Sequence, residues 1–176
     1  MNNELQFGIQ TNGIKHTHLD PLPDIDYRFS MVKAAKVFDY VDKTPEKDEI
    51  NSFLKAKDKY QIPIKAGGWF YTIGEHKSLL KKNLLTAQNL GSTVHNTQIQ
   101  AINSEGNLVT NLEVRDVYLE AYDMGLKLGV TPCFEVHVNM WSEDFLRVNQ
   151  VGNLVEEKGV EFNITLDHSH VIFKIN

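Results

Sequence analysis

The chain has 176 residues, of which 41% are hydrophobic and 23% charged, and its formal net charge is −5. This composition is that of an ordinary globular domain, so we expect a single domain over residues 1–176. The lysines are scattered and the arginines are only three, whereas a nucleic-acid binder usually presents a basic face. We therefore expect no nucleic-acid partner.

The sequence also disfavours a membrane or secreted protein. No apolar run approaches the roughly 18 residues of a membrane-spanning helix, so we expect no membrane partner. The first residues, MNNELQFGIQ, lack the basic and apolar regions of a secretory signal. The single cysteine, Cys133, lies in an apolar run and leaves no disulfide within one chain. These features predict a cytoplasmic protein.

Six apolar runs predict β-strands, and several are apolar nearly throughout, which suits parallel sheets covered on both faces. They span residues 5–11, 37–42, 62–67, 92–99, 130–138 and 160–166. Helical patterns lie between them at 26–36, 45–60, 77–90, 112–128 and 143–157. Thr44 and Ser142 are expected to cap the second and the last of these helices. Gly91, Gly129 and Gly159 are expected to end three helices, because glycine adopts the left-handed conformation at little cost.

Alternating strands and helices predict an α/β fold with a parallel sheet. A doubly wound open sheet of six strands would be complete at this length, whereas a (β/α)8 TIM barrel typically needs about 250 residues. The strand–helix units repeat about every 30 residues, which is the spacing of the barrel. We therefore predict an incomplete (β/α)8 TIM-barrel domain with six units, which lacks strands seven and eight.

Polar side chains of ligand type gather at the predicted carboxyl ends of the strands, where parallel α/β folds bind their ligands. Six of the seven histidines stand there: His16, His18, His95, His137, His168 and His170. They are accompanied by Trp69 after the third strand, Gln98 at the fourth, Glu135 and Trp141 at the fifth and Asp167 at the sixth. We expect these side chains to converge on one mouth.

Glu135 and His137 lie two residues apart, so a strand places them on the same face. A carboxylate in the run TPCFEVHV is costly unless it is paired or bound to a cation, and Asp167 after FNITL meets the same difficulty. A divalent metal between the two carboxylates removes their repulsion. Oxygen ligands with imidazole suit Mg²⁺, Mn²⁺, Co²⁺ or Zn²⁺, so we predict a metal held by Glu135 and Asp167.

Structural roles compete with these assignments. Glu135 could pair with a lysine inside the barrel, His137 could be a satisfied core histidine, and Asp167 could cap the turn DHSH. His168 is expected to point away from Asp167 and to be structural. Both tryptophans could pack rather than bind a sugar, and His16 and His18 flank a turn.

The segment CFEVHVNMWSED, followed by ITLDHSH, resembles the xylose isomerase-like TIM-barrel superfamily. This superfamily holds sugar and sugar-phosphate isomerases and epimerases, with endonuclease IV as a more distant member. The order of elements is similar over the whole chain, but the motifs are specific only at the last two strands. The resemblance implies four metal ligands: a glutamate that matches Glu135, an aspartate that matches Asp167, and a histidine and a glutamate from strands seven and eight.

The resemblance also implies the reaction. A proton is abstracted next to a carbonyl, a metal-bound enediolate forms, and the proton returns elsewhere, with Glu135 as one of two catalytic carboxylates. The substrate is a sugar or a sugar phosphate. We assign substrate binding to His137, His170, His95, Trp69 and His16. Because two ligands and one carboxylate are missing, we expect the chain alone to bind metal weakly and to turn over little or nothing.

Two alternatives stay open. An endonuclease IV-like metal phosphodiesterase could use His95 and His16, but GGWFY lacks the histidine expected at the third strand, and the charge does not suit DNA. A barrel remnant without catalysis is the other alternative. An open barrel has two exposed strand edges, so self-association is a further expectation.

Overall fold

A computed structural model describes residues 5–11, 23–44 and 48–170. Their strands form two sheets, and every strand pair within them is parallel. The first sheet contains β1 (Gly8–Ile9), β2 (Tyr40–Asp42) and β3 (Ile64–Ala66), and the second contains β4 (Gly68–Tyr71), β5 (Val94–Ile99), β6 (Thr131–Val136) and β7 (Ile164–Leu166). The α/β class with parallel strands is thus confirmed.

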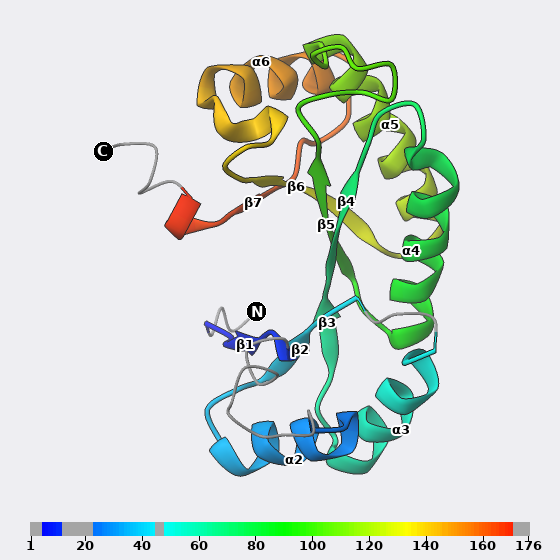
Figure 1. Ribbon diagram of the computed structural model, residues 1–176, viewed down its shortest axis with the longest axis vertical. Coiled ribbons are helices and arrows are strands. Elements are labelled where there is room, and N and C mark those ends of the chain that lie inside the picture. Colours follow the sequence, from blue (N-terminus) through cyan, green and yellow to red (C-terminus); the bar gives the residue numbers. More distant parts are fainter. Residues whose placement is uncertain (1–4, 12–22, 45–47, 171–176) are drawn as a thin grey trace.

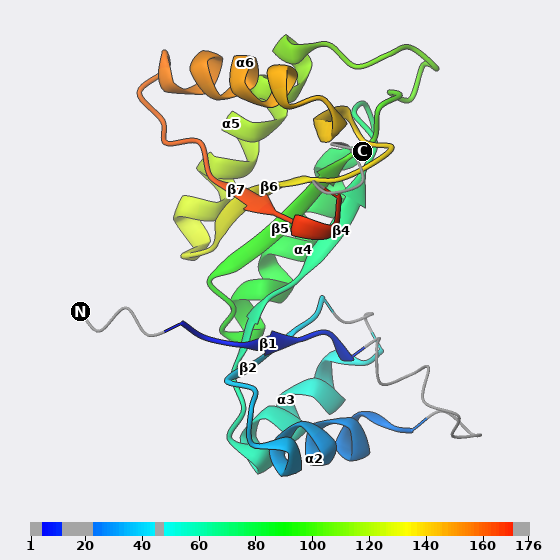
Figure 2. The ribbon, with the colours of Figure 1, turned by 90° about the vertical axis from the view of Figure 1, so that its left-hand side faces the viewer.

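The helices follow the strands in the alternation that the sequence predicted. They are α2 (Ile25–Ala35), α3 (Ile50–Tyr60), α4 (His76–Leu90), α5 (Asn111–Leu128) and α6 (Phe145–Glu156), with a short 3-10 turn, η1 (Trp141–Glu143). Figure 1 shows these helices as an arc around one side of the strands. The end strands β1 and β7 lie on the other side (Figures 1 and 2), which is the arrangement of a partial barrel.

One bent segment joins the two sheets, because β3 and β4 are separated by Gly67 alone. β3 pairs with β2, and β4 pairs with β5. A Cβ atom at Gly67 would overlap Thr44 Oγ1 and would lie 2.7 Å from the Lys43 carbonyl carbon, so only glycine allows this close approach. Trp69 lies within β4, so the prediction that it follows the end of a strand was wrong.

The helix ends confirm some predictions and correct others. Gly91 and Gly129 end α4 and α5 in the left-handed conformation, as expected. The two predicted N-caps were wrong: α3 begins only at Ile50, and α6 is capped by the Asp144 carboxylate, which accepts a hydrogen bond from Leu146 N at 2.9 Å. Ser142 instead donates its hydroxyl to the Glu135 carbonyl at 2.7 Å, so it braces the candidate site.

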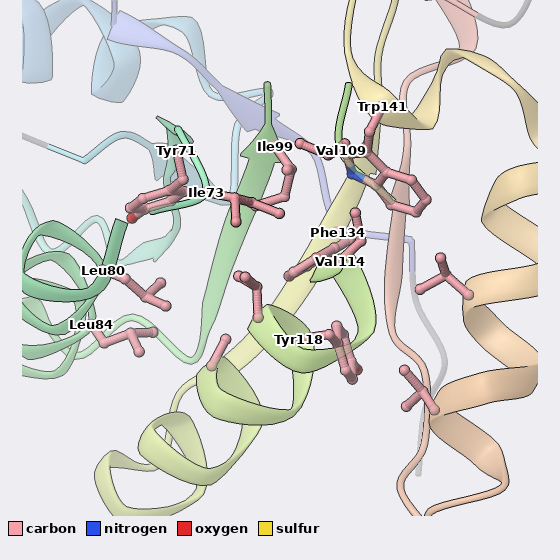
Figure 3. Close-up of a cluster of buried hydrophobic side chains, with 14 of the residues drawn as sticks. Tyr71, Ile73, Leu80, Leu84, Ile99, Val109, Val114, Tyr118, Phe134 and Trp141 are labelled. Carbon is pink, nitrogen blue, oxygen red and sulfur yellow. The ribbon is translucent and has the colours of Figure 1, made fainter. Parts of the chain in front are cut away.

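The larger hydrophobic core lies between the β4–β7 sheet and helices α4, α5 and α6 (Figure 3). Phe134 is 1% exposed, and its ring meets Tyr118 edge-on at a centroid distance of 4.9 Å. A second core, around Phe29 and Phe53, packs α2 and α3 against the first sheet. Within the described ranges, the structure contains no helix that is both long and apolar enough to span a bilayer.

Candidate functional site

A cleft of about 500 Å³ opens at the carboxyl ends of the strands. Its size falls within the usual range of small-molecule pockets. Side chains from both sheets line it: Gln10, Asp42, Lys43, Thr44, Gly68, Trp69, Phe70, Asn96, Gln98, Glu135, His137, Asp167 and His170. The cleft thus brings together five residues of the predicted site, namely Trp69, Glu135, His137, Asp167 and His170.

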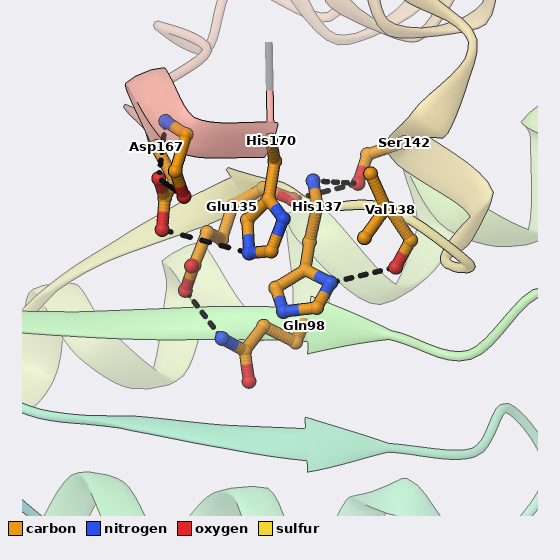
Figure 4. Close-up of polar contacts among 8 residues, drawn as sticks. Gln98, Glu135, His137, Val138, Ser142, Asp167 and His170 are labelled. Atoms are coloured by element: carbon orange, nitrogen blue, oxygen red, sulfur yellow. Dashed lines mark hydrogen bonds and ion pairs between the residues drawn. The ribbon is translucent and has the colours of Figure 1, made fainter. Parts of the chain in front are cut away.

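Strand register decides which side chains reach the cleft. Gly68 lies opposite Asn96, and Asn96 lies opposite Cys133, so all three face the inside of the barrel. The residue two positions further along each strand faces the same way. Gln98 and Glu135 are such positions, and the Gln98 amide donates to Glu135 Oε2 at 2.5 Å (Figure 4). The intervening residues, Thr97 and Phe134, face the helices and are 1% exposed.

Glu135 is a buried carboxylate at the end of β6, with 9% of its surface exposed. Burial raises its pKa above the ordinary value, and the charge of Asp167 raises it further. The Gln98 hydrogen bond and the two histidines act in the opposite direction but do not cancel this rise. A carboxyl group with a raised pKa holds a proton more readily, which is the property of a residue that both takes and returns one.

His137 and His170 lie beside Glu135, and their ring centroids are 3.8 Å apart (Figure 4). His137 Nδ1 is 2.7 Å from the Val138 carbonyl oxygen. Because a carbonyl oxygen only accepts, Nδ1 carries the hydrogen and Nε2 keeps the lone pair for a ligand. One ligand atom each from Glu135, His137 and His170 lies within 4.8 Å of the others.

Asp167 begins the turn that carries His170. Its Oδ1 accepts hydrogen bonds from Ser169 N at 2.8 Å and from Ser169 Oγ at 2.6 Å, and these bonds lower the pKa of Asp167. Its Oδ2 lies 3.5 Å from His170 Nε2. The turn-capping role therefore exists, and Asp167 also faces the histidine. Direct metal binding by Asp167 stays a prediction, because Asp167 stands outside the group of Glu135, His137 and His170.

The residues present fit a divalent metal ion. One carboxylate and two imidazoles are a donor set that suits Zn²⁺ and the harder first-row ions. The buried Nδ1 atom of His170 has no hydrogen-bond partner among the described residues, and a bound metal ion is one group that would satisfy it. His168, one residue from Asp167, is exposed and lies outside the described cleft lining, and its structural role stays a prediction.

His95 does not lie at the mouth. It is fully buried, 2.7 Å from the Tyr71 hydroxyl, which in turn accepts a hydrogen bond from Asn83 at 2.9 Å. Strand parity explains the difference, because His95 and Gln98 are three residues apart on β5 and so face opposite sides. The expectation that the histidines share one mouth was thus wrong for His95. His16 and His18 lie outside the described residues.

The buried position of His95 predicts a pH-dependent stability. Burial lowers the pKa of His95 from 6.5 to about 4. Between these values the unfolded chain binds the proton and the folded chain does not, so stability falls as pH decreases from 6.5 towards 4, by about 3 kcal/mol at most. Chemical denaturation at several pH values should show that His95→Gln flattens this slope relative to the unmodified chain. Equal slopes for the two proteins would contradict the assignment.

Asp42 and Gln98 are among the cleft residues to which the sequence analysis gave no role. Asp42 ends β2, and the rule that polar residues at strand ends form the site would have selected it. Gln98 was noted at its strand end but received no role, although it holds Glu135 in place. Trp69 is partly buried, and it both lines the cleft and packs against the larger core.

No family model matches the sequence, and neither does any curated protein. Solved structures match nearly the whole chain. A xylose isomerase domain containing protein from Salmonella typhimurium LT2 aligns with a TM-score of 0.72 and 17% identity, over 94% of this chain and 61% of that one. The chain therefore shares the TIM-barrel fold of these structures, over part of the barrel. The predicted fold class, an incomplete barrel of this type, is therefore confirmed.

Two other similar structures were solved with a bound ligand. A D-allulose 3-epimerase from Methylomonas sp., in complex with D-allulose, aligns with a TM-score of 0.70 and 12% identity over 98% of this chain and 65% of that one. The IOLI protein with a bound zinc atom aligns with a TM-score of 0.67 and 14% identity, over 94% and 64%. The chain thus spans less than two thirds of each of these neighbours. A probable 3-DHS dehydratase also shares the fold, so the fold does not fix the reaction.

Proposed function

We propose that the chain carries the metal-binding and sugar-binding part of a sugar isomerase or epimerase site. The observation that carries this proposal is the group of Glu135, His137 and His170 in one cleft at the carboxyl ends of the strands. The D-allulose complex and the zinc-bound structure among the neighbours support the same pair of ligands. The substrate that we propose is a small sugar or sugar phosphate.

In this proposal Glu135, His137 and His170 hold the divalent ion, and Asp167 completes the shell or orients His170. When bound, such an ion polarises carbonyl and hydroxyl oxygens as a Lewis acid. Glu135 takes a proton from the carbon next to the sugar carbonyl and can return it. Gln98 fixes the orientation of the Glu135 carboxylate through its hydrogen bond. Phe70, which lies edge-on to His137, gives the substrate an apolar surface.

The chain alone is expected to catalyse this reaction slowly. An isomerase or epimerase of this kind needs an acid and a base on opposite faces of the sugar. Among the described residues, only Glu135 combines a raised pKa with a place in the group that fits a metal. We therefore infer that metal and sugar bind while turnover stays far below the roughly 1 to 1000 per second of ordinary enzymes.

Proton exchange at carbon tests this function directly. The purified chain would be incubated with Mn²⁺ or Co²⁺ and D-allulose in D₂O, and NMR would follow deuterium at the carbons beside the carbonyl and the appearance of an epimer. Slow exchange that disappears in Glu135→Gln supports the proposal. Sugar that remains fully protonated, with no binding detected by calorimetry, favours the alternative of a barrel remnant without catalysis. Cleavage of abasic DNA instead would favour the phosphodiesterase alternative.

A further inference from the structure

The wall of the cleft opposite the Glu135 group comes from the first sheet. Asp42 is the last residue of β2, and Gln10 follows β1 directly. Both line the same cleft as Glu135, which ends β6 in the second sheet. A ligand that touches both walls must therefore present polar groups at two ends. None of the roles described above uses the Asp42 carboxylate.

Among the described residues, the Asp42 carboxylate has no side-chain partner. It is partly buried, and within the described ranges it makes no side-chain hydrogen bond or ion pair. Glu135, in contrast, accepts the hydrogen bond from Gln98. A carboxylate that is withdrawn from water without a donor is destabilising, and burial accordingly raises the pKa of Asp42. A ligand with hydroxyl groups would supply the missing donors.

Among the described residues that line the cleft, negative side chains outnumber lysines and arginines. Three carboxylates line it, from Asp42, Glu135 and Asp167, and Lys43 is the one lysine or arginine among the described lining residues. A bound divalent ion would offset the charge at the Glu135 end but not at the Asp42 end. Phosphate binding relies on cationic side chains and backbone N–H donors. A phosphate group beside Asp42 would meet repulsion instead.

We propose that Asp42 is a substrate-binding residue that accepts hydrogen bonds from hydroxyl groups at the end of the sugar remote from Glu135. The site consequently takes a neutral sugar in preference to the same sugar with a phosphate at that end. This inference rests on the proposed function, because it places the reacting end of the sugar at Glu135. It extends that function by naming the substrate class.

Calorimetric titration of the metal-loaded chain with D-allulose and with D-allulose 6-phosphate tests this inference. The unmodified chain should bind the neutral sugar more tightly. Asp42→Asn should weaken binding of D-allulose about tenfold, since hydrogen bonds to a charged group are stronger than those to a neutral group. The same variant should reduce or reverse the difference in affinity between D-allulose and its phosphate ester. Asp58→Asn, the same change on the exposed surface of α3, should leave both affinities unchanged.

The outcomes separate the inference from the function on which it rests. Zn²⁺ affinity should be the same for Asp42→Asn and for the unmodified chain, because Asp42 stands outside the Glu135 group. If D-allulose binds both proteins equally, or if the phosphate ester binds the unmodified chain more tightly, the inference is wrong and the proposed function stands. If the unmodified chain binds neither metal nor sugar, the proposed function fails and the inference fails with it. Circular dichroism would establish that each variant is folded.

Discussion

Replacing Glu135 with glutamine is expected to lower the affinity of the chain for Zn²⁺ by about 100-fold or more. Losing a residue that only hydrogen-bonds to a metal ligand typically lowers metal affinity roughly 10-fold to 100-fold. Glu135 is itself a proposed ligand, and it is the single carboxylate in the group with His137 and His170. Glutamine keeps an oxygen that can accept the Gln98 amide, so the local packing is preserved. Isothermal titration of the metal-free protein with Zn²⁺ measures the change.

The stability of this variant distinguishes a lost ligand from a lost fold. Burial disfavours the ionised form of Glu135, so removal of its charge should leave the free energy of unfolding equal or slightly higher. His168→Ala is the matched control, because His168 is exposed on the neighbouring turn, and it should bind Zn²⁺ as the unmodified chain does. A Glu135→Gln protein that is folded and keeps full affinity would place the metal elsewhere.

Replacing Phe134 with alanine is expected to reduce the free energy of unfolding by roughly 3 to 5 kcal/mol. Phe134 is 1% exposed and meets three other aromatic rings, those of Tyr118, Trp141 and Phe162. Its removal would leave a cavity between β6 and α5, and the surrounding rings can close it only in part (Figure 3). Urea denaturation followed by circular dichroism measures the loss.

An exposed leucine provides the comparison for Phe134. Leu126 on α5 is 71% exposed, so Leu126→Ala should change the free energy of unfolding by no more than about 0.5 kcal/mol. The Phe134→Ala variant should also bind Zn²⁺ more weakly, because Phe134 lies next to Glu135 on β6. Equal stability of the two variants would mean that the core drawn around Phe134 is not formed in solution.

The strand and helix order was predictable from the sequence because it depends on local patterns. Each of the six predicted runs contains a strand, and each helical pattern matches a helix within a few residues at the ends, but β4 lies outside the predicted runs. The bend at Gly67 was not predictable, since it depends on the approach of the Lys43 and Thr44 backbone from another strand. The N-caps failed for a similar reason, because Ser142 forms a hydrogen bond with the Glu135 carbonyl rather than capping the helix next to it.

The candidate site was predictable where the residue spacing was unambiguous. Glu135 and His137 share a face by the two-residue period of a strand, and the structure places both in the cleft. His95 was assigned to the cleft although Gln98, on the same strand, must face the opposite side. Only the pairing of β5 with β4 and β6 shows which of the two faces inward. Self-association through the edges of β1 and β7 stays a prediction.

Metal binding by the chain is tested most directly by the number of Zn²⁺ ions bound when the metal-free protein is titrated with Zn²⁺, measured by calorimetry together with the histidine ring signals in ¹⁵N NMR. We expect one zinc ion per chain, with the Nε2 signal of His137 and one ring signal of His170 shifted by the metal, and no bound zinc in the double variant His137→Ala, His170→Ala. Zinc that persists in the double variant, or histidine signals that do not respond to zinc, would contradict the claim that Glu135, His137 and His170 form a metal site.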